Sequence, residues 1–456
     1  MIGTKGWQRY APALICLATL LAYSGAFRCP FEFDDEGAIL TNPTIRHVWT
    51  ALVPPGDGSA VQRRPIANLS LALNYAISGV DVWSYHVFNV AAHMAAALLL
   101  FGIARRTWPA GGARSAFAIA ILWAVHPLLT DAVTYVSQRT EVLAGLFALL
   151  TIYCVIRGWN LMAVTACALA VGSKESALLV PVIVVFYDRA FLGKRWSDRW
   201  KLYAGLAATW TIPILMLPHG NEGTAVFGRG VESLEYLLVQ CGVIVHYLRL
   251  SFWPAPLVCD YGFPHSPSPM EVIPSLLIII ALLAGIVVAW RYQPWLGFLG
   301  IWFFAILAPS SSIIPVAQQV AAEKRMYLPL AAVVVLAVVV ARRMRCPGWL
   351  AVPAVVLLTA LTFQRNLDYE SPVTLWADTA TKLPQNARAC NNLGVALGRE
   401  GHFEEAATFC RAAIRLDPNY ADAYNNLGIA LHKLGNRNQA SACLRRASQL
   451  YSRNSR

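Results

Sequence analysis

The chain has 456 residues, of which 57% are hydrophobic and only 14% are charged, and its mean hydropathy is +0.49. This composition excludes a single soluble domain and predicts an integral membrane protein. The formal net charge of +12 would suit a nucleic-acid partner, but much of the excess lies in short basic clusters beside apolar segments. That placement is typical of membrane topology, so we expect no nucleic-acid binding.

Apolar segments of roughly 16–22 residues, long enough to cross a bilayer, recur from the N-terminus to about residue 364. They lie near residues 8–27, 84–104, 115–133, 140–156, 159–173, 175–192, 201–217, 271–290, 294–310, 325–341 and 348–364. The pattern predicts an all-α protein in which residues 1–365 form a polytopic transmembrane helical bundle of about 11 spans.

The segment 232–253 is ambiguous, because Glu232, Glu235 and Arg249 interrupt its apolar sequence. These charges favour an amphipathic helix in the membrane interface over a span. If it does not cross, all basic clusters fall on the cytoplasmic side, as the positive-inside rule requires. These clusters are Arg105/Arg106/Arg114, Lys194/Arg195/Arg199/Lys201 and Arg342/Arg343/Arg345. Eleven crossings then place the N-terminus inside and the C-terminal region outside.

The last seventy residues differ in pattern from the rest, because residues 387–420 and 421–454 align without a gap as two repeats of 34 residues. The aligned pairs include Leu393/Leu427, Gly394/Gly428, Leu397/Leu431, Gly401/Gly435, Ala406/Ala440 and Ala413/Ala447. This period and pattern predict tetratricopeptide repeats over 387–456, preceded by a linker and partial repeat helix over 366–386. We expect Asn391, Asn392, Asn425 and Asn426 to bind a polypeptide acceptor or partner. Alternatively, two repeats merely cap and stabilise the membrane body.

The first long loop, over residues 28–83, contains three adjacent carboxylates, Asp34, Asp35 and Glu36. Adjacent carboxylates repel one another, which raises the pKa of at least one of them unless a cation or donor offsets it. A carboxylate tuned in this way can act as a general base. The alternative is a solvated acidic turn.

Further charged and histidine side chains are expected on the same outer side. They are Arg64, His86, His126, Asp131, Arg139, Glu141, Lys174, Glu175, Glu323, Lys324 and Arg325. Any one of them alone can extend from a span end to the interface, but together they predict a polar site.

Motifs along almost the whole chain closely resemble those of the transmembrane and tetratricopeptide-repeat O-mannosyltransferases. They are Phe33-Asp34-Asp35, Asn42-Pro43, Arg64-Pro65, Tyr85-His86, His126-Pro127, Arg139-Thr140-Glu141, Lys174-Glu175, Trp253-Pro254, Asp260-Tyr261, Pro309-Ser310-Ser311 and Glu323-Lys324-Arg325-Met326-Tyr327-Leu328-Pro329. The resemblance implies a bacterial-type member of the GT-C glycosyltransferase superfamily, with a polyprenyl-phosphate sugar as donor. It also implies that Asp34 and Asp35 occupy the position of the acidic motif in the first extracytoplasmic loop.

A lipid-linked sugar donor would need cations for its phosphate at the outer side of the membrane. The candidates for this role are Arg139, Lys174 and Arg325. Arg64, His86 and His126 are candidates for orienting the sugar or the acidic loop, with Arg64 paired to that loop.

The function predicted from these features is transfer of a sugar from a polyprenyl phosphate to a Ser or Thr hydroxyl of a protein. Asp34 or Asp35 would be the base, and no second carboxylic acid is needed because the phosphate is already a competent leaving group. We expect no tightly bound metal or cofactor, with Asp260 as a weak alternative carboxylate or metal ligand. The expected location is the bacterial inner membrane, with site and repeats extracytoplasmic. No oligomeric state is indicated.

Two other classes remain open at this stage. A transporter of a lipid-linked sugar would also have many spans, but it should show charged or broken segments at mid-membrane and symmetric halves. A non-catalytic, membrane-anchored repeat protein for assembly would leave the loop with Asp34 and Asp35 without a purpose.

Overall fold

The computed structural model describes residues 7–108, 112–194, 196–216, 233–262, 269–311 and 319–454. Arg195 and Glu232, used above for topology, lie outside these ranges. Every regular element within them is helical, which confirms the predicted all-α class. The chain forms two compact units: residues 1–254, 267–315 and 323–367 make the first, and residues 255–266, 316–322 and 368–456 make the second.

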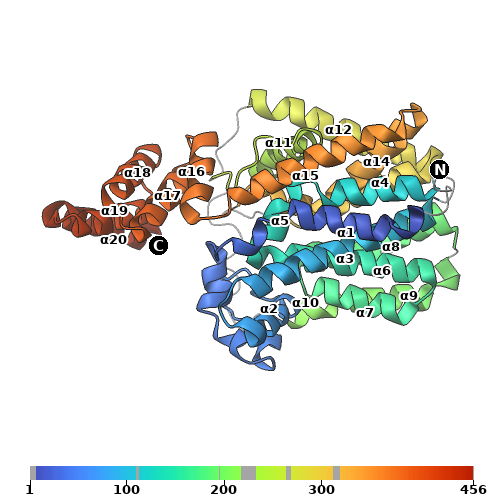
Figure 1. The fold of residues 1–456 in the computed structure, drawn as a ribbon, viewed down its shortest axis with the longest axis horizontal. Coiled ribbons are helices and arrows are strands. Elements are labelled where there is room, and N and C mark those ends of the chain that lie inside the picture. Colours follow the sequence, from blue (N-terminus) through green and yellow to red (C-terminus); the bar gives the residue numbers. More distant parts are fainter. Residues whose placement is uncertain are drawn as a thin grey trace. The chain divides into compact units, whose positions relative to one another are not determined.

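The first unit is a bundle in which helices from its N-terminal half run side by side (Figure 1). These helices are α1 (Ala11–Ala22), α3 (Trp83–Thr107), α4 (Gly112–Ala124), α6 (Arg139–Arg157) and α7 (Asn160–Val171). A small residue permits one close approach, because a Cβ atom on Gly145 of α6 would lie 2.5 Å from the ring of Tyr327. Any larger residue at Gly145 would push Tyr327 out of the bundle.

The remaining helices of this unit are shorter or broken. They are α5 (Thr130–Thr134), α8 (Val180–Tyr187), the π-helical turn η10 (Asp188–Leu192), α9 (Trp200–Ala208), α10 (Thr211–Leu215), α11 (Ser233–Phe252), α12 (Pro269–Tyr292), α13 (Pro294–Leu307), α14 (Pro329–Arg343) and α15 (Ala351–Leu367).

Four helices in the described part of the chain are long and apolar enough to cross a membrane, namely Trp83–Thr107, Val136–Arg157, Met270–Tyr292 and Gly348–Leu367. A fifth candidate is the pair Gly112–Ala124 and Pro127–Thr134, which is bent by 52°. Other apolar segments form helices too short to qualify by length, so the count of about eleven spans stays a prediction. So does the interfacial placement of α11, which is not among the candidates.

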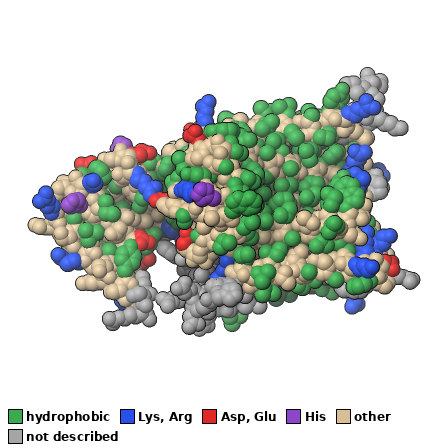
Figure 2. Space-filling model, turned by 90° about the horizontal axis from the view of Figure 1, so that it is seen from below, with side chains coloured by type: hydrophobic (Ala, Val, Ile, Leu, Met, Phe, Trp, Pro, Cys, Tyr) green, Lys and Arg blue, Asp and Glu red, His purple; other side chains and the backbone are tan. Residues whose placement is uncertain are grey.

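The surface of α12 shows why this unit requires a lipid environment. Only 11% of its most apolar window is buried inside the protein, although the mean hydropathy of that window is 2.9. Leu277, Ile280 and Val287 are all more than half exposed. Figure 2 shows hydrophobic side chains covering much of one face of this unit, with Lys and Arg side chains gathered at its right-hand end. An apolar surface of this kind is stable only against hydrocarbon.

The first long loop is a small folded structure rather than an irregular connection. It contains η3 (Glu36–Leu40), η4 (Pro43–Arg46), η5 (Thr50–Leu52) and α2 (Pro65–Ser78), which bury Ala38, Ile39, Ile45 and Leu71 in a common apolar core. Asn68 lies completely buried among these elements, donating to the Thr44 hydroxyl and to the Ala51 carbonyl and accepting from the Asn42 amide. Burial of this asparagine is stable because all these polar groups are bonded. The loop core therefore holds the acidic turn in a defined place.

The second unit consists of α16 (Pro372–Lys382), α17 (Ala387–Arg399), α18 (Phe403–Leu416), α19 (Ala421–Lys433) and α20 (Arg437–Asn454). The equivalent glycines Gly394 and Gly428 let each helix pair approach closely. A Cβ atom at Gly394 would lie 2.7 Å from the Cys410 sulfur, and one at Gly428 would lie 2.8 Å from Leu444. Gly401 and Gly435 turn the chain between paired helices with positive φ angles of 91° and 82°.

Asp260 belongs to this second unit and has a structural role. Its carboxylate pairs with Arg388 at 2.8 Å, and the Asn386 side-chain amide donates to the Asp260 carbonyl at 2.9 Å. The Asp260 carboxylate already accepts from donors of the first repeat helix, and these contacts do not support the weak alternative of Asp260 as a catalytic carboxylate or metal ligand.

Candidate active site

The acidic turn docks onto the connection that precedes α6. Phe33 has a φ of +35°, a left-handed conformation that costs energy for a non-glycine residue and is found where the surrounding structure enforces it. Directly after it, the Asp34 amide donates to the Tyr135 hydroxyl at 2.7 Å. The short helix η8 (Val136–Gln138) follows Tyr135 and supplies the remaining contacts to the turn. The sharp bend at Phe33 thereby brings two carboxylates against η8.

Asp35 is the buried member of the pair, with 1% of its surface exposed. One carboxylate oxygen accepts from the Ser137 amide at 2.7 Å and the other from the Glu32 amide at 3.0 Å. Burial raises the pKa of Asp35 to about 7, and the two backbone donors oppose that rise. Both oxygens are occupied by the main chain, so Asp35 holds the turn in place.

Asp34 is the accessible member of the pair. Its side chain is partly exposed, and its Oδ2 accepts from Gln138 Nε2 over 3.4 Å, a long and therefore weak hydrogen bond. The backbone of Asp34 is nevertheless fixed through Tyr135. A positioned carboxylate with little competing hydrogen bonding can accept a proton from a bound hydroxyl.

One cation, Lys324, lies against Tyr135, the residue that fixes the Asp34 backbone, and two others form ion pairs in neighbouring segments. The Lys324 ammonium is 5.5 Å from the centre of the Tyr135 ring, and the Lys324 amide donates to Asp131 at 3.2 Å. Lys174 forms an ion pair of 2.8 Å with Glu141, and Arg64 forms one of 2.9 Å with Glu175. Acids and bases from the first loop, α6 and two later connections thus meet at one end of the bundle.

The pKa of Lys174 depends on the charges around it. Burial lowers the pKa of Lys174 below its ordinary range, and Glu141 opposes that shift. Arg64 and Lys324 lower the same pKa further, because a third positive charge is disfavoured beside two others. This field suits a dianionic or monoanionic phosphate, which would relieve the repulsion among the three cations.

Two of the predicted phosphate ligands are placed differently from Lys174. Arg139 is completely buried, and it donates to Asn74 Oδ1 at 2.6 Å and to the Tyr85 carbonyl at 3.1 Å while its guanidinium stacks on Phe88. Arg325 is 7% exposed and lies within the turn η13 (Glu323–Met326). Arg139 therefore serves to hold α2 and α3 against α6, and the expectation that it binds phosphate is not supported.

The side chains expected to orient a sugar or the loop all bond to protein groups. Arg64 pairs with Glu175 and not with the acidic turn, which corrects the partner expected for it. His86 bonds the Cys29 carbonyl at 2.9 Å, so it fixes the start of the first loop. His126 accepts from the Leu128 amide through Nδ1, which leaves Nε2 to donate to the Ser251 carbonyl at 3.2 Å. His126 thus stabilises the bend between α4 and η7 (Pro127–Leu129).

The four asparagines of the repeats lie on equivalent faces of α17 and α19. Asn391 is buried and accepts from Asn426 Nδ2 at 2.9 Å, while its own amide donates to Asn392 at 3.2 Å. Asn392, Asn425 and Asn426 are partly exposed. The structure therefore joins three of the four in one hydrogen-bonded row, with Asn425 beside Asn426.

Sequence reasoning missed Tyr135, Gln138 and Lys324 as members of the site. Tyr135 and Gln138 lie in a short helical connection that carries no recognisable motif, and Lys324 was noted only as an outer charge next to Arg325. Their role comes from the docking of residues 32–36 onto residues 135–138, which are about a hundred positions apart. The one available signal was the Arg139-Thr140-Glu141 motif immediately after them.

Fold and site together define a helical membrane protein with a carboxylate-and-cation site and a helical repeat unit. Residues 399–435 match the family described as TPR repeat, and residues 421–454 match the family described as tetratricopeptide repeat. The predicted repeats are therefore confirmed, and the second match has the bounds predicted for the second repeat.

The chain is similar to protein O-mannosyl-transferases along most of its length. It is 25% identical to protein O-mannosyl-transferase F38B6.6 of Caenorhabditis elegans over 91% of this chain and 64% of the relative. It is 24% identical to human protein O-mannosyl-transferase TMTC3 over 89% of this chain and 51% of the relative. These similarities confirm the resemblance inferred from the motifs. The chain spans less than two thirds of the length of these relatives.

Among solved structures, a similarity is found to ArnT from Cupriavidus metallidurans bound to undecaprenyl phosphate. The TM-score is 0.44 and the sequence identity 14%, with 99% of this chain and 79% of the other covered.

Proposed function

We propose that this chain is an integral-membrane glycosyltransferase that moves a sugar from a polyprenyl phosphate to a Ser or Thr hydroxyl of a protein. The observation that carries the proposal is the placement of Asp34, a weakly bonded carboxylate whose backbone is fixed by Tyr135, the residue against which Lys324 also packs. The names of the relatives support protein acceptors and make mannose the first sugar to test.

In the proposed reaction, the acceptor hydroxyl oxygen attacks the anomeric carbon while the bond from that carbon to the phosphate oxygen breaks. Asp34 takes the hydroxyl proton, and the polyprenyl phosphate leaves with the bonding electrons. Attack opposite the leaving group inverts the anomeric configuration. Asp35 acts as a positioning residue, since its oxygens hold the turn that presents Asp34.

Lys174 is the cation best placed to receive the donor phosphate. Its side chain is 15% exposed, in contrast to the fully buried Arg139, and an ammonium offers three donors, of which Glu141 takes one. Lys324 and Arg64 add to the positive field felt at Lys174. This field stabilises the charge that develops on the departing phosphate.

The acceptor polypeptide is proposed to bind through the asparagine row of the repeats. Asn392, Asn425 and Asn426 can bond a peptide backbone, because a primary amide both donates and accepts. The basic clusters favour a cytoplasmic location for the opposite end of the bundle, so the site and the repeats are proposed to be extracytoplasmic, in a bacterial inner membrane.

The test is a transfer assay with the full chain in membranes, using polyprenyl-phosphate sugars labelled in the sugar and measuring label in protein. We expect transfer by the wild type with at least one sugar. Asp34→Asn should lower the rate by about 10²–10⁴-fold, the usual contribution of a general base. Glu36→Gln is the matched control, because Glu36 is an exposed neighbour on the same turn and should retain activity.

Full activity of a well-folded Asp34→Asn variant would remove the proposed base. Transfer of label to lipid or water but not to protein by the wild type would overturn the protein acceptor. If the wild type transfers no sugar but its repeats bind peptides, a non-catalytic assembly role would be favoured.

A further inference from the structure

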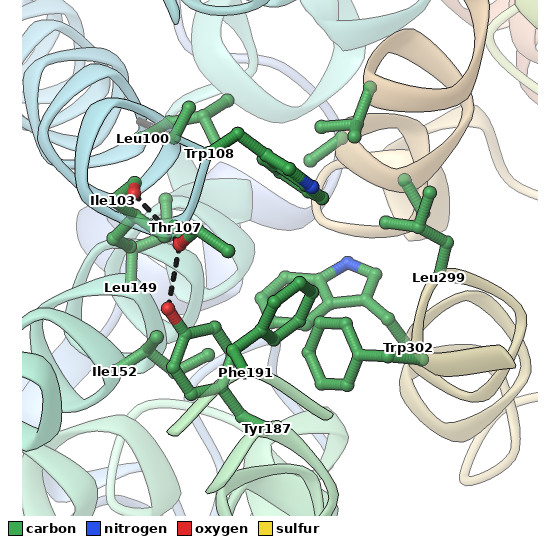
Figure 3. Close-up of a pocket in the computed structure, with 15 residues that line it drawn as sticks. Leu100, Ile103, Thr107, Trp108, Leu149, Ile152, Tyr187, Phe191, Leu299 and Trp302 are labelled. Carbon is green, nitrogen blue, oxygen red and sulfur yellow. Dashed lines mark hydrogen bonds between the residues drawn. The ribbon is translucent and has the colours of Figure 1, made fainter. Parts of the chain in front are cut away.

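A second site lies within the membrane unit, in a cavity between α3, α6, η10, α13 and α14 (Figure 3). The cavity is partly open, and about 460 Å³ is the space within its walls together with the open space at its mouth. Its walls include Leu100, Ile152, Phe191 and Trp302. Among the residues that line it, those with hydroxyl groups are Thr107 and Tyr187.

These two hydroxyls do not make the cavity polar. Thr107 bonds to Tyr187 at 2.6 Å and to the Ile103 carbonyl at 2.8 Å, as the dashed lines in Figure 3 show. A polar ligand would lose its bonds to water here and gain few in return. The lining therefore selects a hydrocarbon.

The cavity is separate from the candidate active site. Leu149 and Ile152 line it from α6, whereas Arg139 begins that helix next to the acidic turn. At 1.5 Å per residue, Ile152 is about 20 Å further along the helix than Arg139. The cavity thus lies toward the end of the bundle at which α3 and α14 finish in pairs of arginines.

Aromatic rings link the cavity to one of these arginines. Trp108 lines the cavity and packs edge-on against Trp295, with their ring centres 6.5 Å apart. The guanidinium of Arg343 lies 5.4 Å from the centre of the Trp295 ring. Arg343 and Arg105 are exposed at this end. An apolar chamber, then tryptophans, then a cation is the order in which a phospholipid presents its chain, its interface and its phosphate.

We propose that the cavity holds one acyl chain of an anionic glycerophospholipid whose phosphate lies against Arg343. The positive charge at the cavity mouth selects the anionic headgroup, because arginines next to the membrane surface attract anionic lipids. The site is independent of the glycosyl-transfer proposal. The bound lipid fills space inside the bundle and stabilises the packing of α13 and α14 on α3.

The test uses the full chain purified in detergent and stripped of lipid, with native mass spectrometry and thermal unfolding as readouts. Phosphatidylglycerol and phosphatidylcholine with the same acyl chains are the probes. Ala332→Phe places a ring in the cavity, because Ala332 lines it and is 5% exposed. Arg343→Gln removes the cation at the mouth without touching the chamber. Leu161→Phe and Arg114→Gln are the matched controls, since both positions are exposed and lie outside the lining.

We expect one phosphatidylglycerol to be retained by the wild type and to raise its Tm by several degrees, more than phosphatidylcholine does. Arg343→Gln should abolish most of the difference between the two lipids, and Ala332→Phe should remove retention of both. The controls should behave as the wild type.

Equal retention of the two lipids by the wild type would overturn the headgroup site. Unchanged retention in a folded Ala332→Phe variant would overturn the cavity as the place of the chain. If Ala332→Phe does not fold, Arg343→Gln still decides, because an exposed substitution leaves the bundle intact. Displacement of phosphatidylglycerol by polyprenyl phosphate, lost in Ala332→Phe, would assign the cavity to the donor and reject the proposal.

Discussion

The two ends of α6 are packed in opposite ways. Near Arg139 the helix meets Asn74, the Tyr85 carbonyl and the acidic turn, with charged groups buried and bonded to protein partners. Near Ile152 it borders the apolar cavity, where polar groups are few and the arginines beyond it are exposed. Charged side chains are buried where protein groups bond to them, and they remain exposed where such partners are lacking.

The largest effect on the free energy of unfolding should come from replacing the buried arginine at one end of α6, compared with replacing an exposed arginine at the other end. Arg139→Leu leaves the Asn74 side-chain oxygen and the Tyr85 carbonyl buried without their donor, at a cost of about 1–3 kcal/mol for each. The matched change at the other end, Arg106→Leu, removes an exposed guanidinium that rests on Tyr153, and it should cost less than about 1 kcal/mol. Thermal unfolding in detergent measures both. Equal losses would break the comparison.

The buried Asp35 carboxyl of the acidic turn should make the stability of the polar end depend on pH. The pKa of Asp35 is about 7 in the folded protein and 3.8 in its ordinary state. Its protonated form is thus favoured by folding, so its contribution is fully present below pH 3.8 and is lost as the pH rises to about 7. The full loss is on the order of 4 kcal/mol.

Hydrogen exchange of the segment around Asp35, corrected for intrinsic rates, should therefore increase from pH 5 to pH 7.5. Asp35→Asn should flatten this dependence, because the amide does not titrate. A wild-type profile identical to that of Asp35→Asn would show that Asp35 does not carry the effect.

Replacing Lys174 should have a smaller effect, mainly on binding of the lipid-linked sugar donor. Lys174→Met removes the partly exposed ammonium that we propose binds the donor phosphate. KM for the lipid-linked sugar should therefore rise about tenfold while kcat changes less. Lys201→Met is the control, since Lys201 is exposed and forms no part of the site. Initial rates at varied donor concentration separate the two parameters. A fall in kcat at unchanged KM would place Lys174 in the transition state alone.

The smallest effect concerns the repeat unit, where a partly buried pair tests the same rule. Arg388→Ala breaks the ion pair to Asp260, whose side chains are 12% and 11% exposed, and should cost about 1 kcal/mol. Hydrogen exchange of residues 257–262 in the full chain should become faster. Arg411→Ala, at an exposed position in α18, should leave it unchanged. Equal exchange rates in Arg388→Ala and Arg411→Ala would show that the ion pair between Arg388 and Asp260 does not stabilise this segment.

Much of the fold followed from sequence patterns. Apolar composition indicated the membrane unit, and the 34-residue period indicated the repeats, because Gly394 and Gly428 recur where helix pairs touch. The three adjacent carboxylates predicted a general base in the first loop, and that role stays a prediction. The different roles proposed for Asp34 and Asp35 were not predictable from the sequence, because the two side chains are identical. They differ because the Ser137 and Glu32 amides donate to Asp35.

The sequence by itself determined that this protein is helical, membrane-embedded and equipped with tetratricopeptide repeats, because composition and periodicity are local properties of a chain. Only the tertiary structure decided that Arg139 is enclosed, that Arg64 pairs with Glu175, and that Tyr135 joins Asp34 near Lys324. Burial and hydrogen-bond partners depend on residues distant in the chain, and these contacts separate a structural charge from one that is open to a substrate.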